Sequence, residues 1–304
     1  MNVALDALWW RLQHPQVRDL AALLVAPPPW LTGRELTLPQ LLGEHGFRYL
    51  LALDARPEPL TGWLAKESVS RLGRYAERLL MFWFANAPHS ELVSANLAVH
   101  DGKDTVGEYD FLVRLNGEPW HLELACKYYM MLGEGPDTLV GPSLRDAWRL
   151  KYHKLHHQLG LSGRAPGRAA LPDGFAGARC ASVLRGTLCY RDGPWLDEPL
   201  SPLQWHGWWR PLGEAWPVSR DDSRWVWLPR LRWLSPARVD EALVQRMEDL
   251  QAQLAGNDVP QLVAECEKRP DGHWHEIARG FVVPVGWPNP ERLDALLRRA
   301  SARG

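Results

Sequence analysis

The chain has 304 residues, of which 46% are hydrophobic and 23% are charged, as is usual for a globular protein with a large core. A formal net charge of −1 excludes a basic field over the whole molecule, so nucleic acid could bind only at a local basic patch. No apolar run approaches the roughly 18 residues of a membrane span, no signal peptide is recognisable, and the four cysteines form no CxxC pair, which together predict a cytoplasmic protein with reduced thiols.

Short helices are expected in an N-terminal segment, residues 1–60. Apolar residues recur at helical spacing through residues 5–24. The His14-Pro15 step should divide this stretch in two, because proline disfavours helix at the residue before it. Prolines at 27–29 end the element, and residues 38–53 form a weaker, mixed segment.

Residues 61–194 predict a compact α/β core. Residues 68–85 have the apolar spacing of a helix, and strands are expected at 91–100, 105–115 and 120–132. Asn116-Gly117 is a strong signal for a tight hairpin between the second and third strands. A helix over 143–159, with Ser143 as its N-cap, and a strand over 181–190 complete the order αβββαβ.

The remaining residues, 195–304, predict an α+β region packed on this core. Eight of the 17 tryptophans lie between Trp195 and Trp233. Such residues can stack on nucleic-acid bases or fill a core, and the spacing of Trp225 and Trp227 along a strand favours packing. A helix over 236–254, a hairpin of 261–267 with 276–285, and a helix over 290–302 are expected to follow.

Two acidic residues should meet across the predicted hairpin. Counting outward from Asn116-Gly117, Asp110 faces Glu123. Facing carboxylates repel one another unless a cation lies between them, and their hard oxygens suit Mg²⁺ or Mn²⁺ with water and phosphate completing the shell. Glu108 and His121 are lesser candidates for the same site. The competing interpretation is a solvated strand face with ordinary acid–lysine pairs.

The arrangement around these acids resembles the PD-(D/E)XK nuclease superfamily over residues 66–191. It comprises a helix with Glu77, a strand, a second strand whose Gly-Glu-x-Asp motif contains Asp110, and a third strand with Glu123 and Lys127, followed by a helix and a strand. The resemblance implies a restriction-endonuclease-like core, a mixed central sheet flanked by helices. The whole chain also resembles an uncharacterised bacterial family of similar length that is often predicted to belong to this superfamily.

The resemblance further implies a role for each of these residues. Asp110 and Glu123 would bind Mg²⁺ or Mn²⁺, Lys127 would assist the attacking water, and Glu77 would join the site. The implied activity is hydrolysis of phosphodiester bonds in DNA or, second in preference, RNA.

The lysine departs from the superfamily pattern. The usual motif is Glu-x-Lys, whereas this chain has Ala125 at that position and Lys127 two residues further on. At a rise of about 3.3 Å per residue, Lys127 is roughly 13 Å from Glu123 along the strand instead of about 7 Å. This departure favours an alternative, a nuclease fold that no longer cleaves and serves as a nucleic-acid-binding or protein-interaction module.

The predicted helix over 143–159 carries a basic face. Its candidate nucleic-acid contacts are Arg145, Arg149, Lys151, Lys154 and Gln158. Cations so placed can hold a phosphate backbone. A solvated face of an ordinary amphipathic helix is the competing interpretation.

Overall fold

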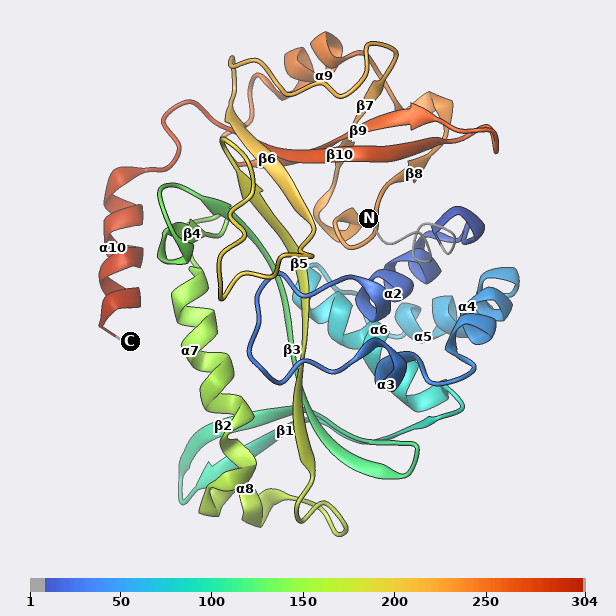
Figure 1. The fold of residues 1–304 in the computed structure, drawn as a ribbon, viewed down its shortest axis with the longest axis vertical. Coiled ribbons are helices and arrows are strands. Elements are labelled where there is room, and N and C mark those ends of the chain that lie inside the picture. The colour runs from blue at the N-terminus through green and yellow to red at the C-terminus, as the bar shows by residue number, and fades with distance from the viewer. Residues whose placement is uncertain (1–8, 303–304) are drawn as a thin grey trace. The chain divides into compact units, whose positions relative to one another are not determined.

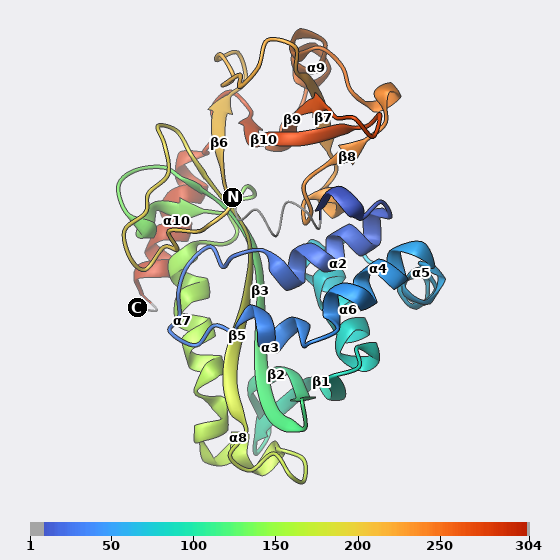
Figure 2. The ribbon, with the colours of Figure 1, turned by 45° about the vertical axis from the view of Figure 1, so that its right-hand side comes forward.

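The computed structural model describes residues 9–302 as a mixed α/β protein (Figures 1 and 2). The N-terminal half contains α2 Pro15–Val25, α3 Leu38–Leu42, α4 Gly46–Ala55, α5 Glu58–Ala65, α6 Leu72–Asn86, β1 Ser90–Asp101, β2 Asp104–Leu115, β3 Glu118–Met131 and β4 Leu139–Val140. The remainder contains α7 Trp148–Leu159, η2 Leu161–Gly163, α8 Ala165–Ala170, β5 Arg179–Tyr190, β6 His206–Pro211, β7 Arg224–Leu228, β8 Arg238–Val239, α9 Met247–Leu254, β9 Gln261–Lys268, β10 Trp274–Val283 and α10 Pro290–Ser301.

The described chain divides into two compact units, each built from two stretches of sequence. The first contains residues 9–126 and Tyr152–Arg185, and the second contains Lys127–Lys151 and residues 186–302. Strands β3 and β5 and helix α7 each contribute residues to both. These units do not coincide with the segments 1–60, 61–194 and 195–304 expected from the sequence, because composition cannot reveal strands that are shared in this way.

In the first unit, strands follow the order β1-β2-β3-β5. Helices α2–α6 lie on one side of β3 and β5, with α8 and the first-unit part of α7 on the other, as both views show (Figures 1 and 2). Helix α6 packs its apolar face on the sheet, where the rings of Phe84 and Phe111 meet edge to face at 5.4 Å. A helix of this length is stabilised mainly by burying such an apolar stripe against the rest of the protein.

The predicted hairpin between the second and third strands is present, with the expected register. Asn116 and Gly117 have φ values of 50° and 84°, the left-handed pair that a two-residue hairpin turn requires. Pairing runs from Leu115↔Glu118 to Phe111↔Leu122. The register agrees with the count from the turn as far as it runs, and it ends one residue before the predicted pair of Asp110 and Glu123.

Two sequence-predicted helices begin later than expected. Helix α7 starts at Trp148, so Ser143 is not its N-cap. Leu144 has φ 54°, and the amide of Gly141 donates to the carbonyl of Asp146 at 2.8 Å, which makes this segment a closed turn. Similarly, α9 covers only Met247–Leu254, because Arg238 pairs with β10 as a short strand.

In the second unit, the strand order is β5-β6-β10-β9-β7. The predicted hairpin is confirmed as the antiparallel pair β9–β10. Trp208, Trp216 and Trp225 form a buried cluster with residues of α9, so these tryptophans are core residues, as the strand spacing favoured. Trp227 differs, since it is 40% exposed. Across residues 9–302, no helix is both long and apolar enough to cross a membrane.

Candidate functional site

Asp110 lies where the ladder between β2 and β3 stops. The last pair is Phe111↔Leu122, and one residue further on, Oδ2 of Asp110 accepts a hydrogen bond from the amide of Leu124 at 2.8 Å. The carboxylate thus supplies the acceptor that a continued ladder would have provided. Its side chain is half-buried. Asp110 therefore has a structural role at this point whether or not it also has a chemical one.

Glu77 projects from α6 toward the acids of β2. Its Oε2 lies 2.6 Å from Nη1 of Arg74, and its side chain is 24% exposed. Burial raises the pKa of Glu77, and the charges of Asp110 and Glu108 raise it further against the opposing effect of Arg74. A positive charge among these carboxylates would relieve their repulsion. The structure thus brings together Glu77 and Asp110, which the sequence resemblance proposed as partners, and adds Glu108.

Glu123 is fully buried and is engaged by a histidine of its own strand. Its side chain and that of His121 are both 0% exposed, and Nε2 of His121 lies 2.6 Å from Oε1 of Glu123. Residues two apart on a strand share a face, which is why the two side chains meet. A charge in such an interior is costly unless it is paired, so His121 stabilises the carboxylate.

A group around His121 was not expected from the sequence. It includes Cys180 at the start of β5 and Ser162 of η2, whose Oγ lies 3.1 Å from the sulfur. Burial raises the pKa of the Cys180 thiol, but hydrogen bonds from His121 and Ser162 and the charges of His121 and Arg34 outweigh it, so the pKa lies below its ordinary value. Hydrogen bonds to the charged form and nearby cations are the usual causes of such a shift.

Tyr109 packs on the same histidine. Its ring lies 4.5 Å from that of His121 in an edge-to-face contact. Burial, together with the charges of Cys180 and Glu123, raises the pKa of Tyr109 to about 12. In the sequence only the i, i+2 spacing of His121 and Glu123 hinted at this group, because Ser162 and Cys180 come from distant segments.

Lys127 belongs to the second unit, where it is engaged by an acid. Its Nζ is ion-paired with Asp146, and the hydroxyl of Tyr129 donates to the same carboxylate oxygen at 3.1 Å. Burial and the negative charge of Asp146 raise the pKa of Tyr129 well above its ordinary value. The resemblance implied a role for Lys127 beside Glu123, whereas in the structure its partner is Asp146.

The residues expected on one basic helix face separate into different environments. Arg149 pairs with Asp137 at 3.1 Å, while Lys154 is exposed and Lys151 is half-buried. Gln158 is only 6% exposed, so it does not lie on the surface where nucleic-acid contact was expected. Arg145 precedes α7, and its carbonyl accepts a hydrogen bond from Arg299 of α10.

The described side chains do not form a complete set of metal ligands by themselves. Within residues 9–302, no cluster of three or more His, Cys, Asp and Glu side chains is placed to hold a metal ion. Mg²⁺ usually takes only one or two protein carboxylates, with water and substrate phosphate as its other ligands.

Comparison with known proteins gives one finding. A family model described as a domain of unknown function, DUF1853, matches residues 7–283. Neither the curated proteins nor the solved structures contain a match to this chain.

Proposed function

We propose that this chain, which belongs to the DUF1853 family, is a Mg²⁺- or Mn²⁺-dependent phosphodiesterase that acts on DNA or RNA. The observation that carries the proposal is that Glu77 of α6 lies close enough to Asp110 and Glu108 of β2 for their charges to raise its pKa, in addition to the larger effect of burial. Carboxylates that repel one another beside an interrupted strand ladder form a region of negative potential where a divalent cation would be stabilised.

The element order supports the same proposal at the level of fold. Helix α6, strands β1–β3, helix α7 and strand β5 follow one another in the order of a restriction-endonuclease-like core. We propose that Glu77 of α6, Asp110 of β2 and Glu123 of β3 belong to one unit because the chain follows this core arrangement. Fold alone does not establish chemistry, so the activity has to be argued from the acids themselves.

Asp110 and Glu123 are the proposed metal ligands, and Glu77 is the proposed supporting acid. The contact of His121 with Glu123 is compatible with this role, because carboxylates that bind metals are commonly oriented by a further hydrogen bond. A bound Mg²⁺ would polarise the phosphate and lower the pKa of a water molecule. The protein residues would hold that ion and fix the orientation of Glu123.

A second candidate function is a nuclease-fold module that binds without cleaving. The specific observation in its favour is that Lys127 is ion-paired with Asp146, while Glu123 is 0% exposed. Both residues then stabilise the fold, and no lysine is assigned to the attacking water.

Cleavage assays on mixed DNA and RNA substrates with Mg²⁺ or Mn²⁺ separate the two functions. The informative variant is Asp110→Asn, since asparagine keeps an oxygen acceptor for the amide of Leu124 but removes the charge. We expect it to lose activity on the order of 100-fold or more, the scale for removing a group that stabilises the transition state electrostatically. Asp104→Asn, at an exposed position of the same strand, is the matched control.

Equal metal-dependent activity in wild type and Asp110→Asn would exclude the proposed site. Binding of nucleic acid with no metal-dependent turnover in the wild type would favour the second function. Circular dichroism of each variant checks that lost activity does not reflect a lost fold.

A further inference from the structure

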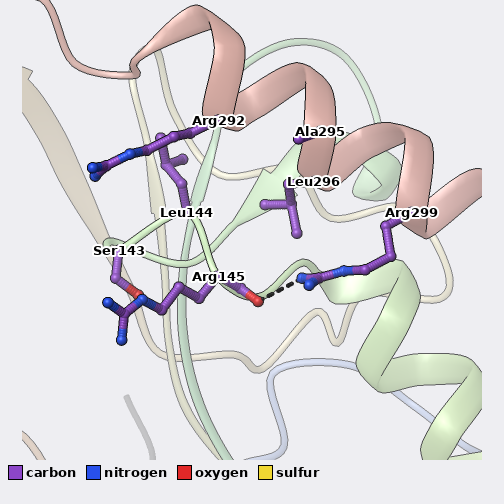
Figure 3. Close-up of a pocket in the computed structure, with 7 residues that line it drawn as sticks. All are labelled: Ser143, Leu144, Arg145, Arg292, Ala295, Leu296 and Arg299. Carbon is purple, nitrogen blue, oxygen red and sulfur yellow. Dashed lines mark hydrogen bonds between the residues drawn. The ribbon is translucent and has the colours of Figure 1, made fainter.

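A cavity in the second unit is lined by arginines from two separate segments. It has a volume of about 530 Å³ and is bounded by Ser143, Leu144, Arg145, Arg292, Ala295, Leu296 and Arg299. The first three residues come from the turn that precedes α7, and the others come from α10 (Figure 3). Volumes of roughly 300–1,000 Å³ are typical of sites for small molecules and cofactors.

Contacts between the turn and α10 fix the walls of this cavity. Nη2 of Arg299 donates to the carbonyl of Arg145 at 2.7 Å, and Nε1 of Trp287 donates to the carbonyl of Pro142 at 3.1 Å. Leu144 and Leu296 belong to one buried apolar cluster, which joins the two segments beneath the cavity. The site is therefore formed before any ligand arrives, which reduces the entropy lost on binding.

The lining is strongly positive. Its seven residues include three arginines and no acid. In the described part of the chain, none of Arg145, Arg292 and Arg299 forms an ion pair with a carboxylate. Other arginines of the unit do have acidic partners, such as Arg149 with Asp137. An excess of cations over a preformed cavity favours an anionic ligand.

The side chains are arranged to bind an anion that also carries a planar ring. In Figure 3, Arg145 and Arg292 extend toward the side of the cavity where Ser143 lies, and Arg299 reaches back to the carbonyl of Arg145. Guanidinium groups bind phosphate through paired hydrogen bonds and stack on planar rings. Leu144 and Leu296 are only 8% and 2% exposed, so the open part of the lining consists mainly of the arginines, Ser143 and Ala295.

We propose that this cavity binds a phosphate and the adjoining nucleoside of a nucleic-acid strand. The inference rests on the proposed function, because it assigns the substrate-strand contact of the same protein to Arg145 and Arg292. It also changes the expected binding surface, since Arg145 now acts with α10 instead of with the basic face of α7. Phosphate contact positions the strand without reading its sequence, so the site should bind different sequences similarly.

The test measures strand binding by the full chain in EDTA, where no metal-dependent cleavage occurs. The probe is a fluorescent single-stranded oligonucleotide of roughly 20 nucleotides, followed by anisotropy over a range of salt concentrations. We expect Arg292→Gln and Arg145→Gln each to weaken binding about 10-fold near 100 mM salt and to reduce the slope of log K against log salt by about 1. Neither side chain has an ion pair to lose, so both variants should fold.

Arg298→Gln is the matched control, because it removes the same charge from the same exposed helix but does not line this cavity. Unchanged binding in both pocket variants, or an equal loss in Arg298→Gln, would overturn the proposal. So would wild-type protein that binds a nucleoside monophosphate or inorganic phosphate as tightly as the oligonucleotide, since a free phosphate compound would then be the ligand.

Failure of this inference is distinguishable from failure of the proposed activity. If Asp110→Asn abolishes metal-dependent cleavage while the pocket variants bind normally, the strand contact lies elsewhere and the activity stands. If the pocket variants lose oligonucleotide binding in EDTA while the wild type shows no metal-dependent cleavage, the proposed strand contact is supported and the proposed phosphodiesterase activity is refuted.

Discussion

The buried pair of His121 and Glu123 allows a quantitative test of how strongly the fold depends on it. Replacing His121 by leucine preserves much of the volume but leaves the Glu123 carboxylate in a position that is 0% exposed. His121 and Glu123 form a buried hydrogen bond of 2.6 Å. Removing one partner of a buried pair typically costs about 3–5 kcal/mol, because the group that remains keeps its desolvation penalty and loses its partner. We expect a loss of that size for His121→Leu.

The assay is urea unfolding followed by tryptophan fluorescence. With an m value of about 3 kcal/mol/M, the midpoint should fall by about 1–1.7 M. In the double variant His121→Leu/Glu123→Met, both polar groups are replaced by apolar ones, and the loss should be much smaller than the sum of the single losses. The cycle therefore measures the coupling of the pair.

A loss below about 1 kcal/mol in His121→Leu, or additive losses in the double variant, would refute this reasoning, since coupled neighbours are expected to be non-additive. Addition of Mg²⁺ tests the proposed metal role in the same experiment. A ligand at 100 times its Kd stabilises the folded state by about 2.7 kcal/mol, so Mg²⁺ should recover part of the lost stability if it binds the uncompensated carboxylates. No recovery would favour the non-cleaving module.

Three further outcomes are expected. Because the pKa of Cys180 is lowered, iodoacetamide should alkylate this thiol near neutral pH, and mass spectrometry should detect the product. Cys189, whose pKa burial raises to about 12, should stay unmodified. The variant His121→Gln should slow the alkylation of Cys180. Because the pKa of Glu77 is higher in the folded protein than in the unfolded chain, Glu77 contributes stability at pH values below its unfolded pKa, and this stability is lost as the pH rises through its folded pKa. Asp110→Asn should lower the pKa of Glu77, which a carbon-13 NMR titration measures. Gly186→Ala should lower the free energy of unfolding in urea by about 3 kcal/mol or more, because Gly186 has a φ of +135° and an added Cβ would clash with the carbonyl oxygen of Lys127. Gly256 has open space around it, so Gly256→Ala should leave the stability nearly unchanged.

Local signals predicted the fold well where the chain reverses on itself. Asn116-Gly117 fixed both a turn and the strand register, and the counted register holds as far as Phe111↔Leu122, one residue before Asp110 and Glu123. The start of α7 was not predictable in this way, because a left-handed Leu144 closes a turn that sequence propensity does not indicate. Periodicity locates an element more securely than it locates the ends of that element.

The candidate site was only partly predictable, because its members come from distant segments. The sequence pointed to Glu77 and Asp110, and the structure couples their charges. It did not show that Cys180 meets His121, since contact between β5 and β3 depends on how the sheet assembles. Nor did it show that Asp146 engages Lys127, for the turn that carries Asp146 was expected to be helix.

Burial also explains why a lysine is absent two residues after Glu123. Ala125 occupies that position and is 2% exposed. An ammonium group there would lose its hydration and would need a carboxylate partner, and the nearest on the same strand face, Glu123, already serves His121. At position 127 the side chain is 30% exposed and has Asp146 as a partner, so a lysine is tolerated. A lysine at position 125 would therefore be unfavourable beside the buried histidine pair, and the proposed activity must operate without one there.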